Sequence, residues 1–356
     1  MIKLRSSIRD YYVHFEETGE FVGSFSSIPQ HCYAVDKNVW RLHSDTLLKT
    51  IDPENILLLH AEEERKSLDT VLQVYNYLIQ RSAKRNMTLI SIGGGIIQDI
   101  TGFACSTLYR GINWIFVPTT LLAQADSCIG SKTSLNYLHH KNLVGSFYPP
   151  SHVHIHTPFL ATLESDYFFS GMGEVVKLAI VGGESTMREM VDLLPAALKR
   201  TAETLAACVH RSLAIKQAYI ADDEFDTGRR NMLNFGHCFG HALESTSNFL
   251  IPHGQAVVIG VILANIVARE RGLLSNNLCT FMLEKLLLPS LAVRPKSADL
   301  DPGAVIAGMQ KDKKRVGGGL VLIMAKDRCE MVKVTDLEPA EVSRALAETG
   351  ELLGVA

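Results

Sequence analysis

The chain has 356 residues, of which 47% are hydrophobic and 21% charged, and its formal net charge is −3 at pH 7. This length suits two domains or one large one, and the near-neutral charge gives no electrostatic reason to expect nucleic acid or an anionic membrane as a partner. The seven cysteines are dispersed without paired spacing, which is typical of reduced thiols. Because the chain contains no apolar run of signal-peptide or membrane-spanning length, we expect a cytoplasmic protein.

The first part of the chain alternates short apolar strands with helical patterns. Strands are predicted at residues 31–36, 56–59, 88–92, 113–117 and 153–156, with helical periodicity over 67–79. Strand and helix alternating in this way predict a parallel α/β sheet covered by helices. Such sheets bind ligands at the carboxyl ends of their strands.

From about residue 159 long helical patterns follow one another. Helices are predicted at 171–179, 187–199, 201–221, 231–248, 256–271, 277–288 and 336–353, with a small hairpin at 320–325 and 330–334. We therefore expect an α/β domain over residues 1–158 and a mainly α-helical domain over 159–356. The cleft between the two halves is the expected active site.

A glycine run, Gly93-Gly94-Gly95, follows one predicted strand and leads through Asp99 into a helix. Glycines there allow exposed amides and the positive end of the helix to meet a pyrophosphate. The spacing is GGGxxxD rather than the general GxGxxG fingerprint, so a simple tight turn remains the alternative.

His237 and His241 are four residues apart and would project from one helix face, where two imidazoles can share a metal ion. A third histidine, His253, follows between a proline and a glycine. Glu174 lies three residues before Lys177 on an apolar helix, where a buried carboxylate needs a strong partner. One carboxylate with two imidazoles is the ligand set of a catalytic zinc. Core packing and a surface ion pair are the alternatives.

Two groups of cations suit anionic ligands. Arg110, Lys132, Lys141 and Asn142 lie in a segment that is otherwise small and apolar, which suits a phosphate or a solvated loop. Lys216 and Arg230 flank the acidic run 222–224, so they would bind a carboxylate or phosphate, or merely neutralise the acids. Residues 311–314 precede three glycines and offer another anion site or a basic turn.

Together these motifs resemble 3-dehydroquinate synthases and the wider sugar phosphate cyclases. The motifs GGGxxxD, RGxxxxxVPTTLLAQAD, K-x₈-KN, GEVVK, R-x₃-NFGHxFGHALE, PHG and DKK occur in the same order between residues 36 and 318. The resemblance implies a Rossmann-like NAD-binding α/β domain over 1–158, a helical metal- and substrate-binding domain over 159–356, and a homodimer.

The resemblance also implies the site residues. Zn²⁺ or Co²⁺ would be held by Glu174, His237 and His253, with His241 beside the metal as a catalytic group rather than a ligand. The residues implied to line the NAD cofactor are Asp36, Glu63, Lys66, Gly93, Gly94, Gly95, Asp99, Thr119, Thr120, Asp126, Lys132, Lys141, Phe159, Thr162 and Leu163.

Substrate contacts follow from the same motifs. The substrate phosphate would meet Lys132, Asn142, Asn234, Lys313 or Lys314, and Arg110 from a neighbouring subunit. A substrate carboxylate would meet Lys216 and Arg230, and Lys177 and His241 would assist next to the metal. Ser131, Cys238 and Gln255 replace a glycine, a threonine and a glutamate that are usual in the family.

The implied reaction converts 3-deoxy-D-arabino-heptulosonate 7-phosphate into 3-dehydroquinate and phosphate by transient NAD-dependent oxidation, phosphate elimination, reduction and aldol cyclisation. Three alternatives remain. The first is a cyclase for an aminated analogue, as in the 3-amino-5-hydroxybenzoate pathway, or for another sugar phosphate. The second is a metal-dependent alcohol or glycerol dehydrogenase, and the third is a non-enzymatic binding module.

Overall fold

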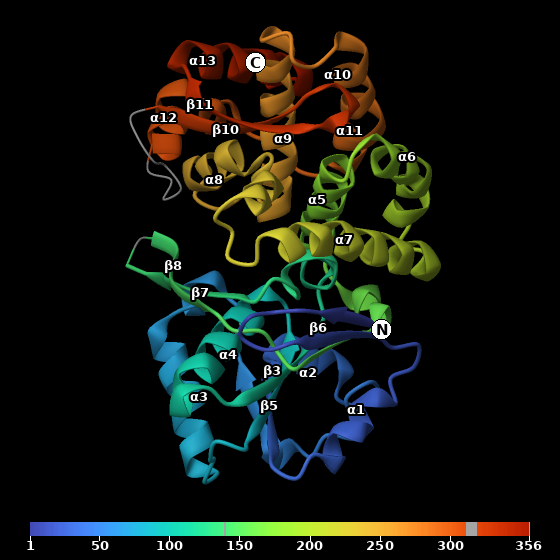
Figure 1. Ribbon diagram of the computed structural model, residues 1–356, viewed down its shortest axis with the longest axis vertical. Helices are drawn as coiled ribbons and strands as arrows, with labels where there is room; N and C mark the ends of the chain where they lie inside the picture. Colours follow the sequence, from blue (N-terminus) through green and yellow to red (C-terminus); the bar gives the residue numbers. More distant parts are fainter. Residues whose placement is uncertain (139, 311–318, 356) are drawn as a thin grey trace. The chain divides into compact units, whose positions relative to one another are not determined.

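The computed structural model describes residues 1–138, 140–310 and 319–355 (Figure 1). The chain divides into two compact units, Met1–Leu163 and Glu164–Ala356. The domain boundary expected from the sequence, after residue 158, stays a prediction. Among the described residues, none of the helices combines the length and the apolar character that a bilayer crossing requires.

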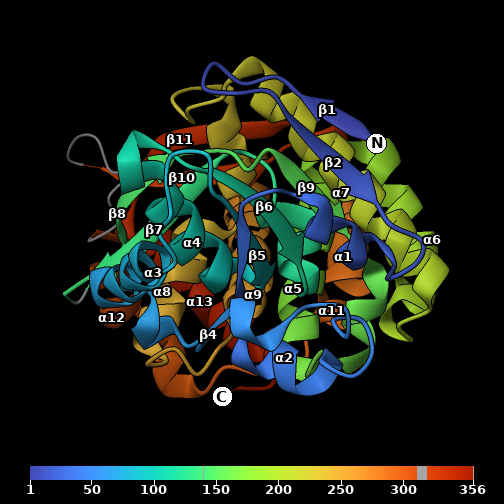
Figure 2. The ribbon, with the colours of Figure 1, turned by 90° about the horizontal axis from the view of Figure 1, so that it is seen from below.

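The first unit is built around a seven-stranded sheet in the order β1-β2-β9-β6-β5-β3-β4. Its strands are β1 (Ile2–Leu4), β2 (Tyr11–Phe15), β3 (His31–Asp36), β4 (Ile56–Leu59), β5 (Thr88–Gly93), β6 (Asn113–Pro118) and β9 (His152–Ile155). Neighbouring strands are parallel except β1 and β2, and Figure 2 shows β2, β9, β6 and β5 following one another across the sheet. The predicted parallel α/β sheet is confirmed.

The apolar runs become strands because the sheet is covered. Every residue of the central strand β5 is buried, as a parallel sheet requires. Helix α4 (Gly95–Thr107) packs against β5 and β6, and α3 (Leu68–Gln80) packs against α4. Phe21 of α1 (Phe21–Ser24) belongs to a core cluster that also contains Ile90, Val117 and Phe159 and against which α2 (Lys37–His43) packs.

A two-stranded antiparallel ribbon carries Lys132 and Lys141, for which a solvated loop was one of the two interpretations. It consists of β7 (Lys132–Tyr137) and β8 (His140–Phe147). A Cβ atom on Gly145 would lie 2.3 Å from the carbonyl oxygen of Thr133, so the two strands need glycine at this crossing. The alternation of side chains here is weak, and the sequence did not predict this ribbon.

The second unit is mainly helical, as predicted. Its helices are α5 (Ser165–Val181), α6 (Glu184–Leu198), α7 (Ala202–Asp222), α8 (His237–Thr246), α9 (His253–Glu270), α10 (Asn276–Met282), α11 (Leu288–Ser290), α12 (Pro302–Gln310) and α13 (Pro339–Leu353), and β10 (Leu320–Ala325) pairs with β11 (Met331–Leu337). The single helix predicted over 231–248 is wrong. A 3₁₀ turn ends at Asn234, and Gly236, with φ of 79°, separates it from α8.

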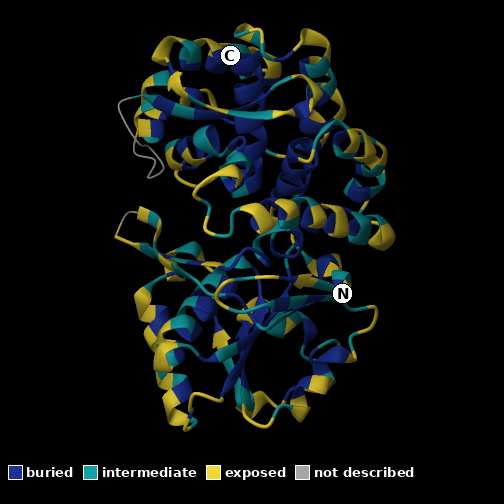
Figure 3. Cartoon of the chain, viewed as in Figure 1, coloured by how far each residue is buried: buried dark blue, intermediate teal, exposed yellow. Residues whose placement is uncertain are grey.

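Helix α9 is the centre of the second unit. Its residues 254–268 are all buried, and the helix is almost entirely dark blue in Figure 3. α5, α8, α13 and β10 pack against it. A helix that is apolar all round in this way is a core element, and its first residue, His253, belongs to the candidate metal site.

Candidate active site

Glycine contacts bring three helices unusually close together. A Cβ atom on Gly173 of α5 would lie 2.2 Å from the carbonyl oxygen of Gly254 on α9. A Cβ on Gly260 of α9 would lie 2.0 Å from the carbonyl oxygen of Gly236, just before α8. Backbone therefore packs directly on backbone at both crossings, which only glycine allows.

These crossings place Glu174, His237 and His253 around one point. One oxygen of Glu174, Oε1, lies 3.4 Å from His237 Nε2 and 3.2 Å from His253 Nε2. One ligand atom from each residue lies within 4.8 Å of the other two. Zinc–ligand bonds of about 2.0–2.2 Å in a tetrahedron separate neighbouring ligand atoms by about 3.4 Å. The observed separations therefore suit a shared ion.

Glu174 supplies a second sign that the residues fit a metal. The carboxylate is 1% exposed, and neither oxygen has a well-directed hydrogen bond among the described residues. Lys177 Nζ lies 2.6 Å from Oε2, so the carboxylate has an ion-pair partner. That contact does not have the geometry of a hydrogen bond. A divalent cation would satisfy such a group at low cost.

The two histidines are held by their other ring nitrogens. His237 Nδ1 lies 3.2 Å from the carbonyl oxygen of Phe235, and His253 Nδ1 lies 3.1 Å from Glu244 Oε2. Such outer contacts fix the ring and direct Nε2 at a metal. Both histidines begin helices, whose positive ends disfavour an imidazolium. A role for Glu244 was not predicted, because its contact with His253 depends on how α8 and α9 pack.

The ionisation of the three residues follows from burial and charge. Burial lowers the pKa of His237 to about 4. Burial acts in the same direction on His253, but Glu244 and Glu174 outweigh it and raise the pKa of His253 to about 10. Burial also opposes the charge of Glu174, yet Lys177 and His237 hold its pKa well below the usual value. Glu174 is thus held as a carboxylate, which is the form that binds a metal.

His241 lies beside this group, one turn after His237. Its ring centroid is 5.4 Å from that of His237 and 5.9 Å from that of His253. His241, Glu244 and His253 form a second group with the spacing of metal ligands. The two groups use opposite nitrogens of His253, because Nε2 faces Glu174 and Nδ1 faces Glu244. We favour the first group as the metal site, because neither carboxylate oxygen of Glu174 has a directed hydrogen-bond donor among the described residues.

Lys216 and Arg230, the expected carboxylate contacts, are both buried. Arg230 donates from its guanidinium to the carbonyl oxygen of Glu224. Arg229 pairs with Asp222, and Asp223 accepts backbone N–H groups, including that of Arg230 at 3.0 Å. The acidic run is thus stabilised by Arg229 and by backbone amides, which weakens the alternative that Arg230 serves only to neutralise it.

In the first unit the glycine run forms the turn between β5 and α4. A Cβ on Gly93 would lie 2.6 Å from Ile97, and one on Gly94 would lie 2.9 Å from Thr120. Thr119 donates its N–H to the carbonyl oxygen of Gly93 at 3.0 Å, which joins the ends of β6 and β5. The run therefore lies at the carboxyl edge of the parallel sheet, where such folds bind ligands.

Beside this turn is a network that the sequence could not reveal. Lys66 Nζ lies 2.6 Å from Asp99 Oδ2 and 2.5 Å from Asn142 Oδ1. Asp99 also accepts from the N–H and hydroxyl of Ser134. Burial raises the pKa of Asp99, and Lys66 opposes the rise. Asn142 was expected to bind the substrate phosphate. It instead contacts Lys66, which with Asp99 was expected to line the cofactor.

The remaining residues of the first unit are spread more widely. Lys141 Nζ lies 4.0 Å from Glu63 Oε1, and Asp36 caps α2 by accepting from the N–H of Asn38 at 2.8 Å. The residues not placed in these contacts lie as follows: Thr120 in the turn after β6, Asp126 in a π-helical turn at Ala123–Ser127, Lys132 exposed at the start of β7, Phe159 and Thr162 against His43, Leu163 at the end of the unit, and Arg110 exposed in the turn before β6.

In the second unit, Asn234 donates to the carbonyl oxygen of Asn231 at 2.9 Å. Lys313 and Lys314, expected at the substrate phosphate, lie outside the described residues.

Two departures from the family pattern acquire a structural explanation. Ser131 has a φ of 64°, in the left-handed region that favours the family's glycine. Gln255 is fully buried and donates to the carbonyl oxygens of Phe169 and Ser290 while accepting from the N–H of Ala292. Gln255 therefore ties α9 to its neighbours, and a glutamate would need a proton to make the same donations.

The fold and the grouped residues define a class: an α/β unit with a glycine-rich turn at the carboxyl edge of its sheet, followed by a helical unit with a carboxylate–histidine cluster. The profiles of the N-terminal and C-terminal domains of 3-dehydroquinate synthase match residues 56–170 and 171–315. A 3-dehydroquinate synthase of Dehalococcoides mccartyi is 38% identical over 313 residues, which cover 86% of each chain. The chain belongs to the 3-dehydroquinate synthase family.

Two solved structures share the fold. The 2-epi-5-epi-valiolone synthase ValA of Streptomyces hygroscopicus, solved with NAD⁺ and Zn²⁺, has a TM-score of 0.85 at 23% identity and covers 99% of both chains. A 2-deoxy-scyllo-inosose synthase, complexed with carbaglucose-6-phosphate, NAD⁺ and Co²⁺, has a TM-score of 0.85 at 24% identity, covering 98% of this chain and 99% of that one.

Proposed function

We propose that this chain is a 3-dehydroquinate synthase, which converts 3-deoxy-D-arabino-heptulosonate 7-phosphate into 3-dehydroquinate and phosphate. Family membership over both units supports the reaction. The observation that carries the proposal is the group Glu174, His237 and His253, with a buried carboxylate whose oxygens lack directed donors. We assign NAD and zinc, or cobalt, as cofactors, as in the two solved cyclases.

Glu174, His237 and His253 would hold the metal, and the turn Gly93–Gly95 with its neighbours would hold NAD. When bound, these groups polarise the substrate alcohol and accept its hydride reversibly. The role of the chain is then to orient the substrate and to stabilise charge as it develops.

Lys177 and His241 are the groups next to the metal site that can assist the alcohol. Lys177 Nζ contacts Glu174 at 2.6 Å and is 2% exposed, so its charge is held inside the site. His241 is exposed and can exchange a proton with solvent. We assign charge stabilisation at the alcohol oxygen to Lys177 and proton transfer to His241.

The reaction is redox-neutral in this scheme. Oxidation of the alcohol acidifies the neighbouring C–H, phosphate leaves by β-elimination and takes that proton, and the hydride returns to the carbon it left. Opening of the ring gives an enolate that adds to the ketone and closes the carbocycle. In an alcohol or glycerol dehydrogenase, by contrast, the hydride leaves with the cofactor.

The substrate assignment within the family depends on Lys216 and Arg230. Both are buried, and a guanidinium can bind a carboxylate through two parallel hydrogen bonds. Cyclases for sugars without a carboxylate do not need this pair. An aminated heptulosonate phosphate would satisfy the same pair, so it remains the second candidate substrate.

The test is incubation of the purified protein with zinc, NAD⁺ and either heptulosonate phosphate, its amino analogue or sedoheptulose 7-phosphate. We expect phosphate release and a carbocyclic product of the mass of dehydroquinate from the first. Faster turnover of either other substrate would mean that the chain is a cyclase for that substrate instead. Absence of phosphate release from all three would refute the assignment as a cyclase. We also propose a cytoplasmic homodimer, which light scattering on the purified protein would test.

A further inference from the structure

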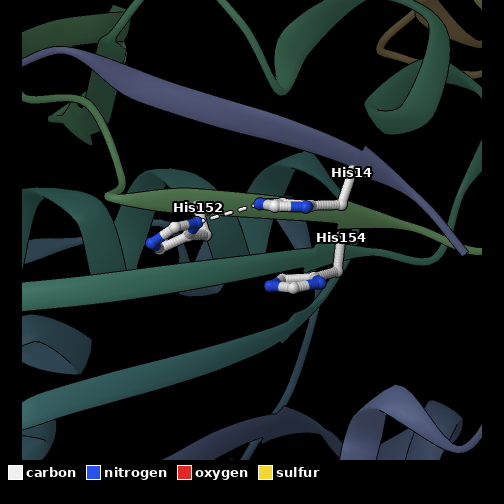
Figure 4. A group of neighbouring side chains, drawn as sticks. All are labelled: His14, His152 and His154. Atoms are coloured by element: carbon white, nitrogen blue, oxygen red, sulfur yellow. Dashed lines mark hydrogen bonds between the residues drawn. The ribbon is translucent and has the colours of Figure 1, made fainter. Parts of the chain in front are cut away.

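Three histidines lie together in the first unit, and none of them is among the candidate active-site residues named above. His14 belongs to β2, and His152 and His154 belong to β9 (Figure 4). The parallel register sets His14 opposite His154. Side chains alternate along a strand, so all three imidazoles project from one face of the sheet, while Val13 is buried on the other.

The nitrogens of these rings converge. His14 Nε2 lies 2.9 Å from His152 Nδ1, and the rings of His14 and His154 stack with centroids 4.7 Å apart. One nitrogen from each ring lies within 4.8 Å of the other two. Around a tetrahedral zinc the nitrogens would be about 3.4 Å apart. Each nitrogen–nitrogen distance therefore needs to change by at most about 1.4 Å to accommodate the ion. Small side-chain rotations supply such a change.

Glu16 orients one of the rings. Its Oε1 lies 2.7 Å from His154 Nδ1, which leaves Nε2 to face the other two histidines. Figure 4 shows the outer ends of His14 and His154 pointing the same way, toward the side on which His152 lies. A carboxylate behind a histidine is the usual outer support of a metal ligand, where it fixes the tautomer and raises the basicity of the ligating nitrogen.

The surroundings keep the imidazoles neutral. Burial lowers the pKa of all three rings, and lowers that of His154 to about 4 although Glu16 opposes the change. Phe21 stacks on His154 with centroids 5.5 Å apart, and Phe25 meets the same ring edge-on. Neutral imidazoles backed by apolar rings are in the protonation state that binds a metal.

We propose that His14, His152 and His154 form a second metal site, for a divalent transition ion of the zinc class, with Glu16 as a positioning residue. Three imidazoles suit Zn²⁺, Co²⁺, Ni²⁺ or Cu²⁺ rather than Mg²⁺ or Ca²⁺, which prefer oxygen. The ion would cross-link β2 to β9 and so fasten the antiparallel β1–β2 pair to the parallel part of the sheet. The inference does not depend on the catalytic assignment, because it concerns other residues.

The alternative is a packing layer, in which stacked and hydrogen-bonded neutral imidazoles bind no ion. The two are separated by Zn²⁺ and Co²⁺ binding to tag-free, full-length protein carrying His237→Ala and His253→Ala, which removes the other metal group. We expect this background to take up about one equivalent of Zn²⁺, to acquire the visible absorption of a Co²⁺–imidazole centre, and to melt at a higher temperature with Zn²⁺ than with Mg²⁺.

Further variants in the same background identify the ligands. His14→Ala or His152→Ala should abolish the uptake, whereas His31→Ala, a half-buried histidine of the same sheet outside the cluster, should retain it. Glu16→Ala should weaken Zn²⁺ affinity by about 10–100-fold while stoichiometry at saturation is preserved. Absence of uptake by the folded background protein would overturn the proposal whether or not the histidine variants fold. Uptake that survives both His14→Ala and His152→Ala would overturn it as well.

Discussion

Gly173→Ala tests whether the backbone contact between α5 and α9 positions the metal ligands. The added Cβ would lie 2.2 Å from the carbonyl oxygen of Gly254, while ordinary van der Waals contacts of a Cβ begin near 3.4 Å. The helices must therefore separate by about 1 Å, and metal–ligand distances tolerate only about 0.2 Å. Glu174 is the next residue on α5, and His253 precedes Gly254 on α9, so the separation acts directly on two of the proposed ligands.

The magnitude follows from two opposing effects. Alanine in a helix interior is favoured over glycine by roughly 0.5–1 kcal/mol, whereas overpacking against a rigid neighbour costs typically 1–3 kcal/mol and sometimes more. We expect Gly173→Ala to lower the free energy of unfolding by about 1–2 kcal/mol, which is about 2–8 °C in Tm for a unit of this size. Zinc affinity should fall by at least about 100-fold.

Gly350→Ala is the matched control. Gly350 also lies inside a helix of the second unit, but its added Cβ would meet nothing closer than 3.7 Å. The free energy of unfolding of this variant should rise by about 0.5–1 kcal/mol, and its zinc affinity should stay unchanged. The assay is thermal unfolding of both variants with zinc titration by calorimetry. Unchanged Tm and unchanged zinc affinity in Gly173→Ala would refute the reasoning.

The remaining predictions concern ligands, substrate and pH. His253→Ala should lose the metal and His241→Ala should keep it, as metal analysis would reveal; because His253 belongs to both groups, loss of the metal in His241→Ala would assign it to the His241 group instead. Arg230→Ala should lower kcat/KM for heptulosonate 7-phosphate by roughly ten- to a hundredfold, because it removes a charge-assisted hydrogen bond to the substrate carboxylate worth about 1–3 kcal/mol, while leaving sedoheptulose 7-phosphate unaffected; equal kcat/KM for both substrates on the unmutated enzyme would contradict it. Burial lowers the pKa of His154 from 6.5 to about 4, so the unfolded chain binds a proton that the folded chain excludes. The free energy of unfolding should therefore fall as the pH decreases from 6.5 to 4. His154→Gln should reduce that fall, as measured by urea unfolding in zinc-free buffers at each pH.

The sequence predicted those elements whose pattern is local. Strands β3 and β4 occupy the predicted residues because continuous apolar runs bounded by polar turns have few alternatives in a covered parallel sheet. The helix predicted over 231–248 is broken because Gly236 adopts a left-handed conformation that lets the backbone meet Gly260. Helical periodicity does not report such a contact.

Site features that depend on packing were harder to predict. The family motifs named Glu174, His237 and His253, and the structure brings their ligand atoms within 4.8 Å. The role of Glu244 behind His253 and the tie that Gln255 makes between α9 and Ser290 appear only once the helices are assembled. The cluster of His14, His152 and His154 depends on the register of β2 against β9, two strands separated by most of the first unit.

Glu174, His237 and His253 are proposed as the metal site of a redox-neutral cyclase. The most direct test supplies heptulosonate 7-phosphate in large excess over both enzyme and NAD⁺, with zinc present, and follows phosphate and the nicotinamide absorbance together. We expect many phosphates to be released per NAD⁺ with no accumulation of NADH, and we expect Glu174→Ala to lose turnover. NADH formed in proportion to the substrate consumed would contradict this expectation and assign the chain to the dehydrogenases.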